Sequence, residues 1–331
     1  MAWFVVYLWL SVVSVAFARL RRGPLRPSWT FGYEVVTRAQ KRFHERVARL
    51  EPAEERKAWA SLKGQNPSSK RVTWTRSARG DVDCIDINPR QRISSERVIL
   101  YLHGGGFLYG SERSHGELCS RIALSAEARL VFPLYRLAPE HPFPSALEDV
   151  LAVYRALLES GTRPSDVVVA GDSAGGNLAL ALLLTLRDRG EALPARAVLL
   201  SPCVDLTDRS GSIRDNEPFD WASPWMFDRW QREYLSGKDP GAPLASPARA
   251  ELRGLPPLLL QIGTAEMLYD QVTSFARVAQ ASGVEVTLEE YPDRVHLWHA
   301  LAPMFPEFQA SIDRIGEYAL ARGSSRAMRV R

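Results

Sequence analysis

The sequence predicts an α/β fold in which a mostly parallel sheet is covered by helices on both faces. Short apolar runs, typical of buried strands, alternate along the chain with longer helical segments. With 331 residues, 46% of them hydrophobic, the chain is long enough to build one large core, which we expect over residues 25–331. The strand-like runs are Val98–Leu102, Leu130–Leu134, Val167–Ala170, Ala197–Leu200, Pro257–Ile262 and Glu285–Tyr291.

Residues 1–24 form an apolar N-terminal segment that precedes this domain. Residues 2–18 carry no charged side chain and are just long enough to span a bilayer. No arginine precedes the run and several follow it, which favours an uncleaved membrane anchor with the catalytic domain on the cytoplasmic side. Ala16 and Ala18 form an A-x-A pattern, which instead favours export through a cleaved signal peptide, although no basic residue precedes the run. The third interpretation is a helix packed on the surface of a soluble cytoplasmic protein.

A glycine loop follows the run Val98–Leu102. Its sequence is His103-Gly104-Gly105-Gly106-Phe107, and three consecutive glycines are costly in chain entropy. They are useful where backbone N–H groups must turn toward a ligand, such as the oxyanion of an acyl-transfer reaction. Each such donor typically contributes about 2.7–4 kcal/mol to lowering the barrier. A flexible loop without function is the alternative.

A serine follows the run Val167–Ala170, in the sequence G-D-S-A-G-G-N at residues 171–177. The pattern G-x-S-x-G, here Gly171, Ser173 and Gly175, is typical of a nucleophilic serine in a sharp strand-to-helix turn. The next residues, Asn177–Leu184, are apolar nearly all round and predict a buried helix whose N-terminal amides point at the serine. Taken alone, this motif also fits an ordinary turn of small residues.

With these two motifs, the chain resembles the hormone-sensitive-lipase-like carboxylesterases, the H-G-G-G and G-D-S-A-G-G branch of the α/β-hydrolases. The likeness runs from about Val98 to His299 and includes Y-R-L-A-P-E-H-P-F-P at residues 135–144 and Ser201-Pro202. It implies an α/β-hydrolase fold with a helical cap formed by the N-terminal region, about residues 25–70, and an insertion, about residues 205–247.

The resemblance also implies roles for individual residues. Ser173 would be the nucleophile, and the amides of Gly105, Gly106 and Ala174 would form the oxyanion hole. His103 and Asp172 would be supporting residues. Arg136 and Glu140 would lie behind the site, although a surface ion pair explains them equally well.

The triad acid is expected after the strand Pro257–Ile262, because the order in this fold is serine, acid, histidine. The family pattern there is G-x-x-D-x-L, and this chain has Gly263, Glu266 and Leu268, with glutamate in place of aspartate. Glutamate is an accepted triad acid. We therefore predict Glu266, with Asp270 as the competitor.

The base must be a histidine after that acid, which leaves His296 and His299. The strand Glu285–Tyr291 and a short loop lead directly to His296, whereas His299 lies one helical turn later. We predict His296, although Leu297 and Trp298 replace the glycine and phenylalanine that usually follow it in the family. Its ordinary pKa near 6.5 suits a general base at neutral pH.

Aromatic residues mark the predicted insertion. Between residues 205 and 247 they recur at spacings of about four, which predicts a helix with one aromatic face; these residues are Trp221, Trp225, Phe227, Trp230 and Tyr234, with Met226 among them. Ordinary helix packing explains the pattern, and so does the wall of an apolar substrate pocket. For that pocket we predict Phe107, Trp221, Trp225 and Trp298.

The motifs together predict a serine ester hydrolase that needs no cofactor, and the resemblance to the family implies short to medium acyl chains. An amidase or deacetylase with the same triad is the alternative enzyme, and a small-molecule receptor on the same fold is the alternative outside enzymes.

Three cysteines without metal spacing give no metal site. The net charge of +4 is concentrated near residues 19–26 and 322–331, and no nucleic-acid motif accompanies it. We therefore expect a small-molecule ester as partner and no nucleic acid; the sequence leaves the oligomeric state open.

Overall fold

One twisted sheet forms the centre of the molecule. The computed structural model describes residues 2–61, 66–91, 93 and 96–321, so the arginine-rich segment 322–331 lies outside it. Within the described ranges the sheet has eight strands in the order β1-β2-β4-β3-β5-β6-β7-β8. Its first two strands, β1 (Val72–Arg79) and β2 (Val82–Pro89), are antiparallel to their neighbours, and the other six are parallel. The predicted fold class is confirmed.

All six predicted strands are present, with ends shifted by at most two residues. They are β3 (Val98–Leu102), β4 (Arg129–Pro133), β5 (Val167–Asp172), β6 (Arg196–Leu200), β7 (Leu258–Gly263) and β8 (Val286–Tyr291). Every residue of β3, β5, β6 and β7 is buried, which explains their uninterrupted apolar runs. Strands β1 and β2 were not predicted, because charged and polar residues interrupt both sequences and neither contains a continuous apolar run.

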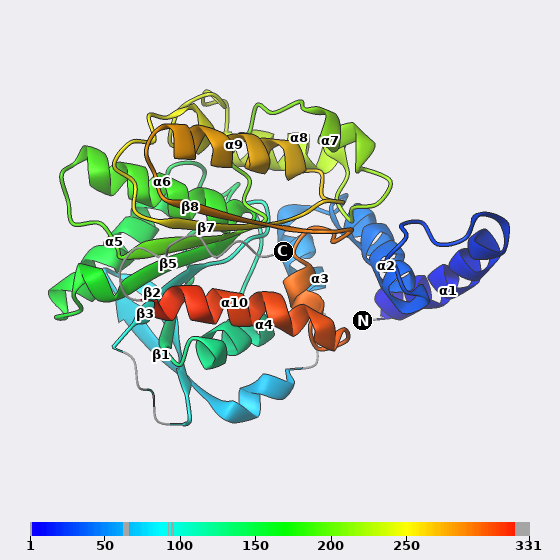
Figure 1. The fold of residues 1–331 in the computed structure, drawn as a ribbon, viewed down its shortest axis with the longest axis horizontal. Coiled ribbons are helices and arrows are strands. Elements are labelled where there is room, and N and C mark those ends of the chain that lie inside the picture. Colours follow the sequence, from blue (N-terminus) through cyan, green and yellow to red (C-terminus); the bar gives the residue numbers. More distant parts are fainter. Residues whose placement is uncertain (1, 62–65, 92, 94–95, 322–331) are drawn as a thin grey trace.

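Helices cover both faces of the sheet (Figure 1). On one face lie α4 (Glu112–Ser125) and α10 (Gln309–Leu320), and on the other lie α5 (Ser145–Glu159), α6 (Ala174–Asp188) and α9 (Tyr269–Ala281). Helix α6 is buried along nearly its whole length, as its apolar sequence predicts. Five short 3₁₀ segments complete the described chain: Pro67–Arg71, Pro164–Asp166, Pro247–Arg249, Trp298–Leu301 and Pro306–Phe308.

Four helices from two distant parts of the chain lie within the predicted cap segments. They are α2 (Phe31–Val47), α3 (Pro52–Ser61), α7 (Gly211–Asp215) and α8 (Pro224–Leu235). A buried ion pair joins α8 to α3, with Arg229 Nη1 2.7 Å from Glu55 Oε2. This contact holds the two cap segments together over one end of the sheet.

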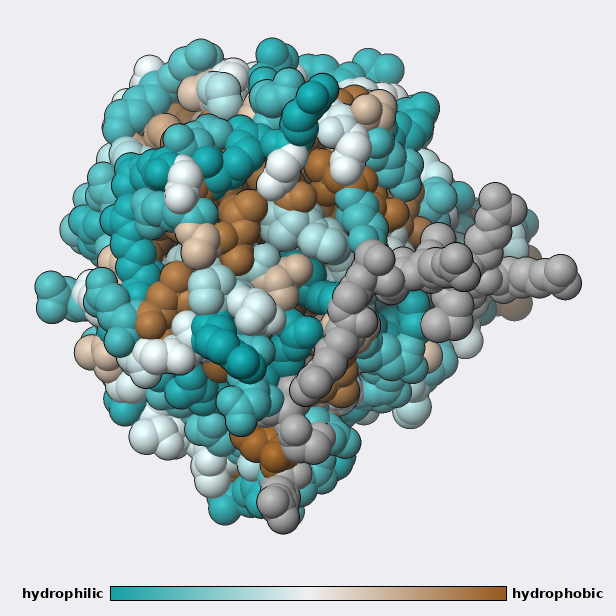
Figure 2. Space-filling model, turned by 60° about the vertical axis from the view of Figure 1, so that its left-hand side comes forward, coloured by the Kyte–Doolittle hydropathy of each residue, from teal (hydrophilic) through white to brown (hydrophobic). Residues whose placement is uncertain are grey.

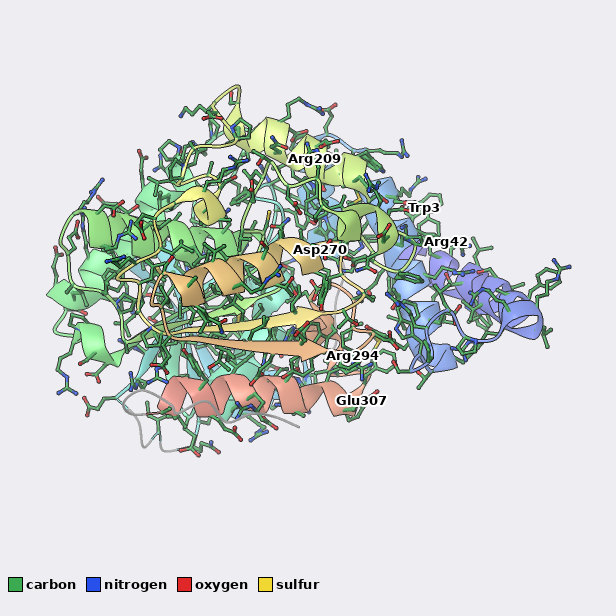
Figure 3. The ribbon with its side chains drawn as sticks, turned by 45° about the horizontal axis from the view of Figure 1, so that its top comes forward. Trp3, Arg42, Arg209, Asp270, Arg294 and Glu307 are labelled. Atoms are coloured by element: carbon green, nitrogen blue, oxygen red, sulfur yellow. The ribbon has the colours of Figure 1, made fainter. Side chains whose placement is uncertain are left out.

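The N-terminal helix α1 (Ala2–Arg22) lies along α2, at the edge of the molecule (Figure 1). Ser11 and Val15 are fully buried against α2, and Arg19 and Arg22 pair with the buried carboxylate of Glu34. By length and composition, residues 3–22 are sufficient to cross a membrane. Trp3 and Arg42, labelled in Figure 3, mark the region where the two helices meet.

The outer side of α1 is apolar and exposed. Six apolar residues at positions i, i+3, i+4, i+7, i+11 and i+14 form it, with exposed fractions from 45% for Val6 to 87% for Leu20; they are Val6, Trp9, Leu10, Val13, Phe17 and Leu20. On the face of the body that Figure 2 shows, hydrophobic surface instead occurs in separate patches within largely hydrophilic surface. We call this set of six residues the outer face of α1.

Candidate active site

Ser173 sits in the turn between β5 and α6 with a strained backbone. Its φ of 52° and ψ of −118° lie outside the regions that L residues normally adopt, at a typical cost of about 1–3 kcal/mol. The turn is closed so tightly that a Cβ atom on Gly175 would lie 1.9 Å from the carbonyl oxygen of Leu102. The small residues of the motif are therefore required by the fold itself.

The glycine loop lies against this turn. Gly105 and Gly106 have φ values of 116° and 59°, and both border the same cavity as Ser173. Within the described part of the chain, neither of their amides donates to a protein acceptor. Ala174, the first residue of α6, follows Ser173 directly, so its amide lies at the helix end where N–H groups lack intrahelical partners. These are the three amides predicted for the oxyanion hole.

Asp172 holds the glycine loop beside the serine. Its Oδ1 accepts hydrogen bonds from Gly104 N at 3.0 Å and Tyr101 Oη at 2.8 Å, and its Oδ2 lies 3.4 Å from His115 Nε2. Burial alone would raise the pKa of Asp172, but His115 and the hydroxyl of Tyr101 hold that pKa below its ordinary value. An anionic Asp172 therefore fixes the loop. The other predicted support, His103, is fully enclosed and stacked on Tyr135.

Glu266 and His296 form a buried hydrogen-bonded pair. His296 Nδ1 lies 3.0 Å from Glu266 Oε2, while Glu266 Oε1 accepts from Gly263 N at 2.6 Å and Ser201 Oγ at 2.8 Å. Burial raises the pKa of the glutamate. For His296, burial opposes the charge, yet the hydrogen bond and the negative charge of Glu266 raise its pKa above 6.5. His296 borders the cavity together with Ser173.

The two competing residues lie elsewhere. Asp270, at the start of α9 (Figure 3), accepts a hydrogen bond from Ser212 N at 2.8 Å. His299 lies in the 3₁₀ segment 298–301, its Nε2 2.8 Å from Gln261 Oε1, and burial lowers its pKa to about 3. Ser173 and His296 therefore border one cavity, and the carboxylate hydrogen-bonded to His296 is that of Glu266.

The sequence analysis missed a second buried carboxylate, Asp220. Its Oδ1 accepts from Trp221 N at 2.8 Å and His296 N at 3.2 Å, and its Oδ2 accepts from Met267 N at 2.9 Å. Burial raises its pKa. Asp220 thus ties the loops that carry Glu266 and His296 to the predicted cap insertion. No motif surrounds it in the sequence, so only its fully buried position reveals it.

A cavity of about 230 Å³ lies between Ser173, His296 and the cap. Of the four predicted pocket residues, Trp221 borders it and donates from Nε1 to His296 O at 2.8 Å. Trp230 from α8, another member of the predicted aromatic set, also borders the cavity, and the sequence analysis did not name His44 on α2, Trp59 on α3 or Tyr109, which line the same wall.

The structure places the other three predicted pocket residues outside the wall. Phe107 is buried and stacked on Tyr234, with ring centroids 3.6 Å apart. Trp225 lies under Arg49, and Trp298 is stacked on His299.

Arg136 and Glu140 do not pair with each other. Arg136 Nη2 lies 2.7 Å from Asp149 Oδ1, whereas Glu140 Oε2 lies 2.6 Å from Arg56 Nη2. Arg56 also donates to the backbone oxygens of Leu108 and Ala138. Glu140 therefore helps to fasten the cap helix α3 to the loops of the body.

A strained serine between a central strand and a buried helix, with a carboxylate and a histidine after later strands, is the arrangement of the α/β-hydrolases. The comparisons with known proteins agree. Residues 99–300 match a family model described as alpha/beta hydrolase fold. The chain is 44% identical over 227 residues to an acetyl-hydrolase of Streptomyces hygroscopicus, covering 67% of this chain and 75% of that protein. It is 36% identical over 232 residues to an esterase of Acinetobacter venetianus, covering 70% of this chain and 77% of that protein.

Solved structures extend the likeness beyond the matched domain. An esterase from the bacterial hormone-sensitive lipase family superposes with a TM-score of 0.79 at 38% identity, covering 85% of this chain and 97% of that chain. EstE5, in a crystal soaked with p-nitrophenyl butyrate, superposes with a TM-score of 0.78 at 32% identity, covering 94% of this chain and 97% of that chain. The chain therefore belongs to the α/β-hydrolase fold family, among the hormone-sensitive-lipase-like esterases.

Proposed function

We propose that this protein hydrolyses carboxylic esters of short to medium acyl chains through an acyl-enzyme formed on Ser173. The observation that carries the proposal is that His296, hydrogen-bonded to Glu266, borders the same cavity as a serine of positive φ. A strained serine beside a hydrogen-bonded imidazole is the arrangement that nucleophilic catalysis requires.

In the first half-reaction, His296 Nε2 takes the proton of Ser173 as Oγ attacks the ester carbonyl. The amides of Gly105, Gly106 and Ala174 then donate to the oxyanion of the tetrahedral intermediate. Glu266 holds the His296 proton on Nδ1, which leaves Nε2 free to accept, and stabilises the imidazolium. The imidazolium returns its proton to the departing alcohol. In the second half-reaction, a water deprotonated by His296 releases the acid and restores Ser173.

The cavity favours small esters with an apolar part. Its volume is about 230 Å³, and indole or phenol rings of Trp59, Tyr109, Trp221 and Trp230 border it. Such a wall excludes water from the acyl-enzyme and gains free energy by burying apolar substrate surface. The naming of one relative as an acetyl-hydrolase is consistent with a short acyl group.

The test measures kcat/KM for p-nitrophenyl acetate, butyrate and octanoate with the full-length protein, beside its Ser173→Ala and His296→Ala variants. We expect the wild type to prefer the two shorter esters and both variants to lose activity while keeping the wild-type thermal midpoint. Full activity of Ser173→Ala would contradict the mechanism. Turnover of N-acetyl arylamides but not of these esters would favour the amidase or deacetylase. No turnover of either class would favour the receptor.

We also propose that α1 attaches the enzyme to the cytoplasmic face of a membrane. The outer face of α1 is a continuous apolar strip, and Arg21 and Arg22 are exposed at its end, next to Arg19. Apolar residues flanked by arginine are typical of helices that bind the interface of anionic membranes. The buried pairing of Glu34 with Arg19 and Arg22 favours a helix that stays on α2 while its outer face enters the lipid.

Vesicle sedimentation tests this attachment. The full-length protein should sediment with vesicles containing phosphatidylglycerol, and replacing Trp9, Val13 and Leu20 by glutamine should release it without changing ester hydrolysis. Equal sedimentation of both proteins would contradict the attachment. A mature protein that lacks residues 1–18, seen by mass mapping of its N-terminus, would favour export through a cleaved signal peptide.

A further inference from the structure

The cap side of the cavity carries an imidazole that the proposed mechanism does not use. His44, on α2, borders the cavity and is only 7% exposed. Its ring lies between two indoles, with centroids 4.0 Å from that of Trp221 and 4.5 Å from that of Trp59. Burial lowers the pKa of His44 to about 3, so the ring is neutral at the pH where His296 acts as a base.

The hydrogen bond of Nδ1 fixes the tautomer of this neutral ring. His44 Nδ1 lies 2.7 Å from the backbone oxygen of Gln40, and a carbonyl oxygen can only accept. The single ring proton must therefore be on Nδ1, which leaves a lone pair on Nε2. Nε2 receives no hydrogen bond from the described part of the chain and is not fully enclosed. Since His44 borders the cavity, this acceptor opens into it.

Gln40 adds a second unsatisfied acceptor one helical turn away. Its side chain also borders the cavity, and Oε1 is buried without a donor among the described residues. Buried acceptors that lack a partner cost free energy, and native proteins rarely retain them without a reason. Because Gln40 Oε1 is fully enclosed, it does not open into the cavity, and the acceptor available to a substrate is His44 Nε2.

We propose that His44 forms a polar subsite whose Nε2 accepts a hydrogen bond from a hydroxyl or amide N–H group of the ester. The inference rests on the proposed esterase function and narrows its substrate class to esters that carry such a donor. The ring of Trp221 separates the subsite from the reacting centre, with its centroid 4.0 Å from His44 and 5.1 Å from His296. The donor therefore belongs to the part of the substrate close to the ester bond, in either its acyl or its alcohol half.

Two pairs of isosteric esters test the subsite and distinguish the two halves. The acyl pair is p-nitrophenyl 3-hydroxybutyrate and p-nitrophenyl 3-methylbutyrate, in which a methyl replaces the hydroxyl. The alcohol pair is 2-hydroxyethyl butyrate and propyl butyrate. We expect wild-type kcat/KM to favour the hydroxyl ester about tenfold in one of the two pairs, the factor that one net hydrogen bond contributes.

The variants assign this preference to His44. His44→Phe keeps a flat ring between the two indoles but removes the acceptor, so the hydroxyl-to-methyl ratio should fall to about one. His44→Gln can place an amide oxygen near Nε2 and should restore part of the ratio. His141→Phe, at an exposed histidine, is the matched control and should keep the wild-type ratio. Because each ratio compares two substrates on one sample, any loss of folded protein cancels.

The outcomes separate this inference from the function on which it rests. Turnover of all four esters without a hydroxyl preference would overturn the subsite but leave the esterase standing. An unchanged ratio in His44→Phe would also overturn it. Absence of turnover of every ester would overturn the esterase and the subsite with it.

Discussion

Replacing Glu266 by glutamine should lower kcat/KM about 10⁴-fold, the loss that an acid-to-amide change causes in serine triads through the wrong imidazole tautomer. The structure gives a specific reason. Glu266 Oε1 accepts from Gly263 N at 2.6 Å and from Ser201 Oγ at 2.8 Å, while Oε2 faces His296 Nδ1 at 3.0 Å. Both oxygens of the carboxylate are therefore used as acceptors, and a glutamine has only one.

The Gly263 amide decides which way the glutamine turns. A hydroxyl such as that of Ser201 can rotate to accept, but a backbone N–H can only donate. Turning the carboxamide NH₂ toward Gly263 would leave a buried N–H unpaired at a cost of about 1–3 kcal/mol. The NH₂ should therefore face His296 and force its Nδ1 to accept. The ring proton then moves to Nε2, which can no longer take the proton of Ser173.

The assay is kcat/KM for p-nitrophenyl butyrate from pH 5 to 9, with Asp270→Asn as the control. Asp270 accepts from Ser212 N and makes no contact with His296 among the described residues, so its variant should stay within about threefold of wild type, as peripheral substitutions usually do. A larger loss in Asp270→Asn than in Glu266→Gln would refute the assignment of the acid. A Glu266→Gln enzyme with more than about a tenth of wild-type activity would refute the tautomer argument.

Three further predictions follow from the same region. On the acid side of the wild-type profile, the pH at which kcat/KM falls to half its maximum should lie above 6.5, because Glu266 raises the pKa of His296 and the protonated ring cannot act as a base. In Glu266→Gln this pH should be lower. Gly175→Ala should lower the thermal midpoint far more than Gly32→Ala, since a Cβ at Gly32, whose φ is not positive, meets only the Phe305 ring at 3.9 Å. Asp220→Asn should lower the midpoint by several degrees, measured by differential scanning fluorimetry, because its three backbone donors then face one acceptor oxygen and an NH₂ group.

The sequence predicted those features that depend on local backbone constraints. The turn at Ser173 admits only small residues beside it, since a Cβ on Gly171 would lie 2.4 Å from the carbonyl oxygen of Gly175. A constraint of this kind appears directly as a pattern of residue types. The buried strands are equally visible, because both of their faces must be apolar. The choice of Glu266 over Asp270 followed from the spacing after Gly263, and the geometry is consistent with it although the catalytic roles stay predictions.

The pocket wall could not be predicted in the same way. Trp221 and Trp225 look equivalent at a spacing of four, but Trp221 precedes α8 and turns toward His296, while Trp225 lies on the helix under Arg49. Phe107 adopts a φ of 65° that directs its ring against Tyr234. Only the tertiary arrangement distinguishes these aromatic side chains, because all of them are favourable to bury.

The residues that we propose to select the substrate lie on the predicted cap helices, outside the strands and helices of the body. His44 and Trp59 come from helices before the sheet, and Trp230 from a helix between β6 and β7. The buried ion pair between Arg229 and Glu55 joins α8 to α3, and a lost partner would leave an uncompensated charge. We therefore expect substitution of His44 to change selectivity while Ser173 and His296 stay in place, whereas breaking the ion pair should loosen the walls that α3 and α8 contribute through Trp59 and Trp230.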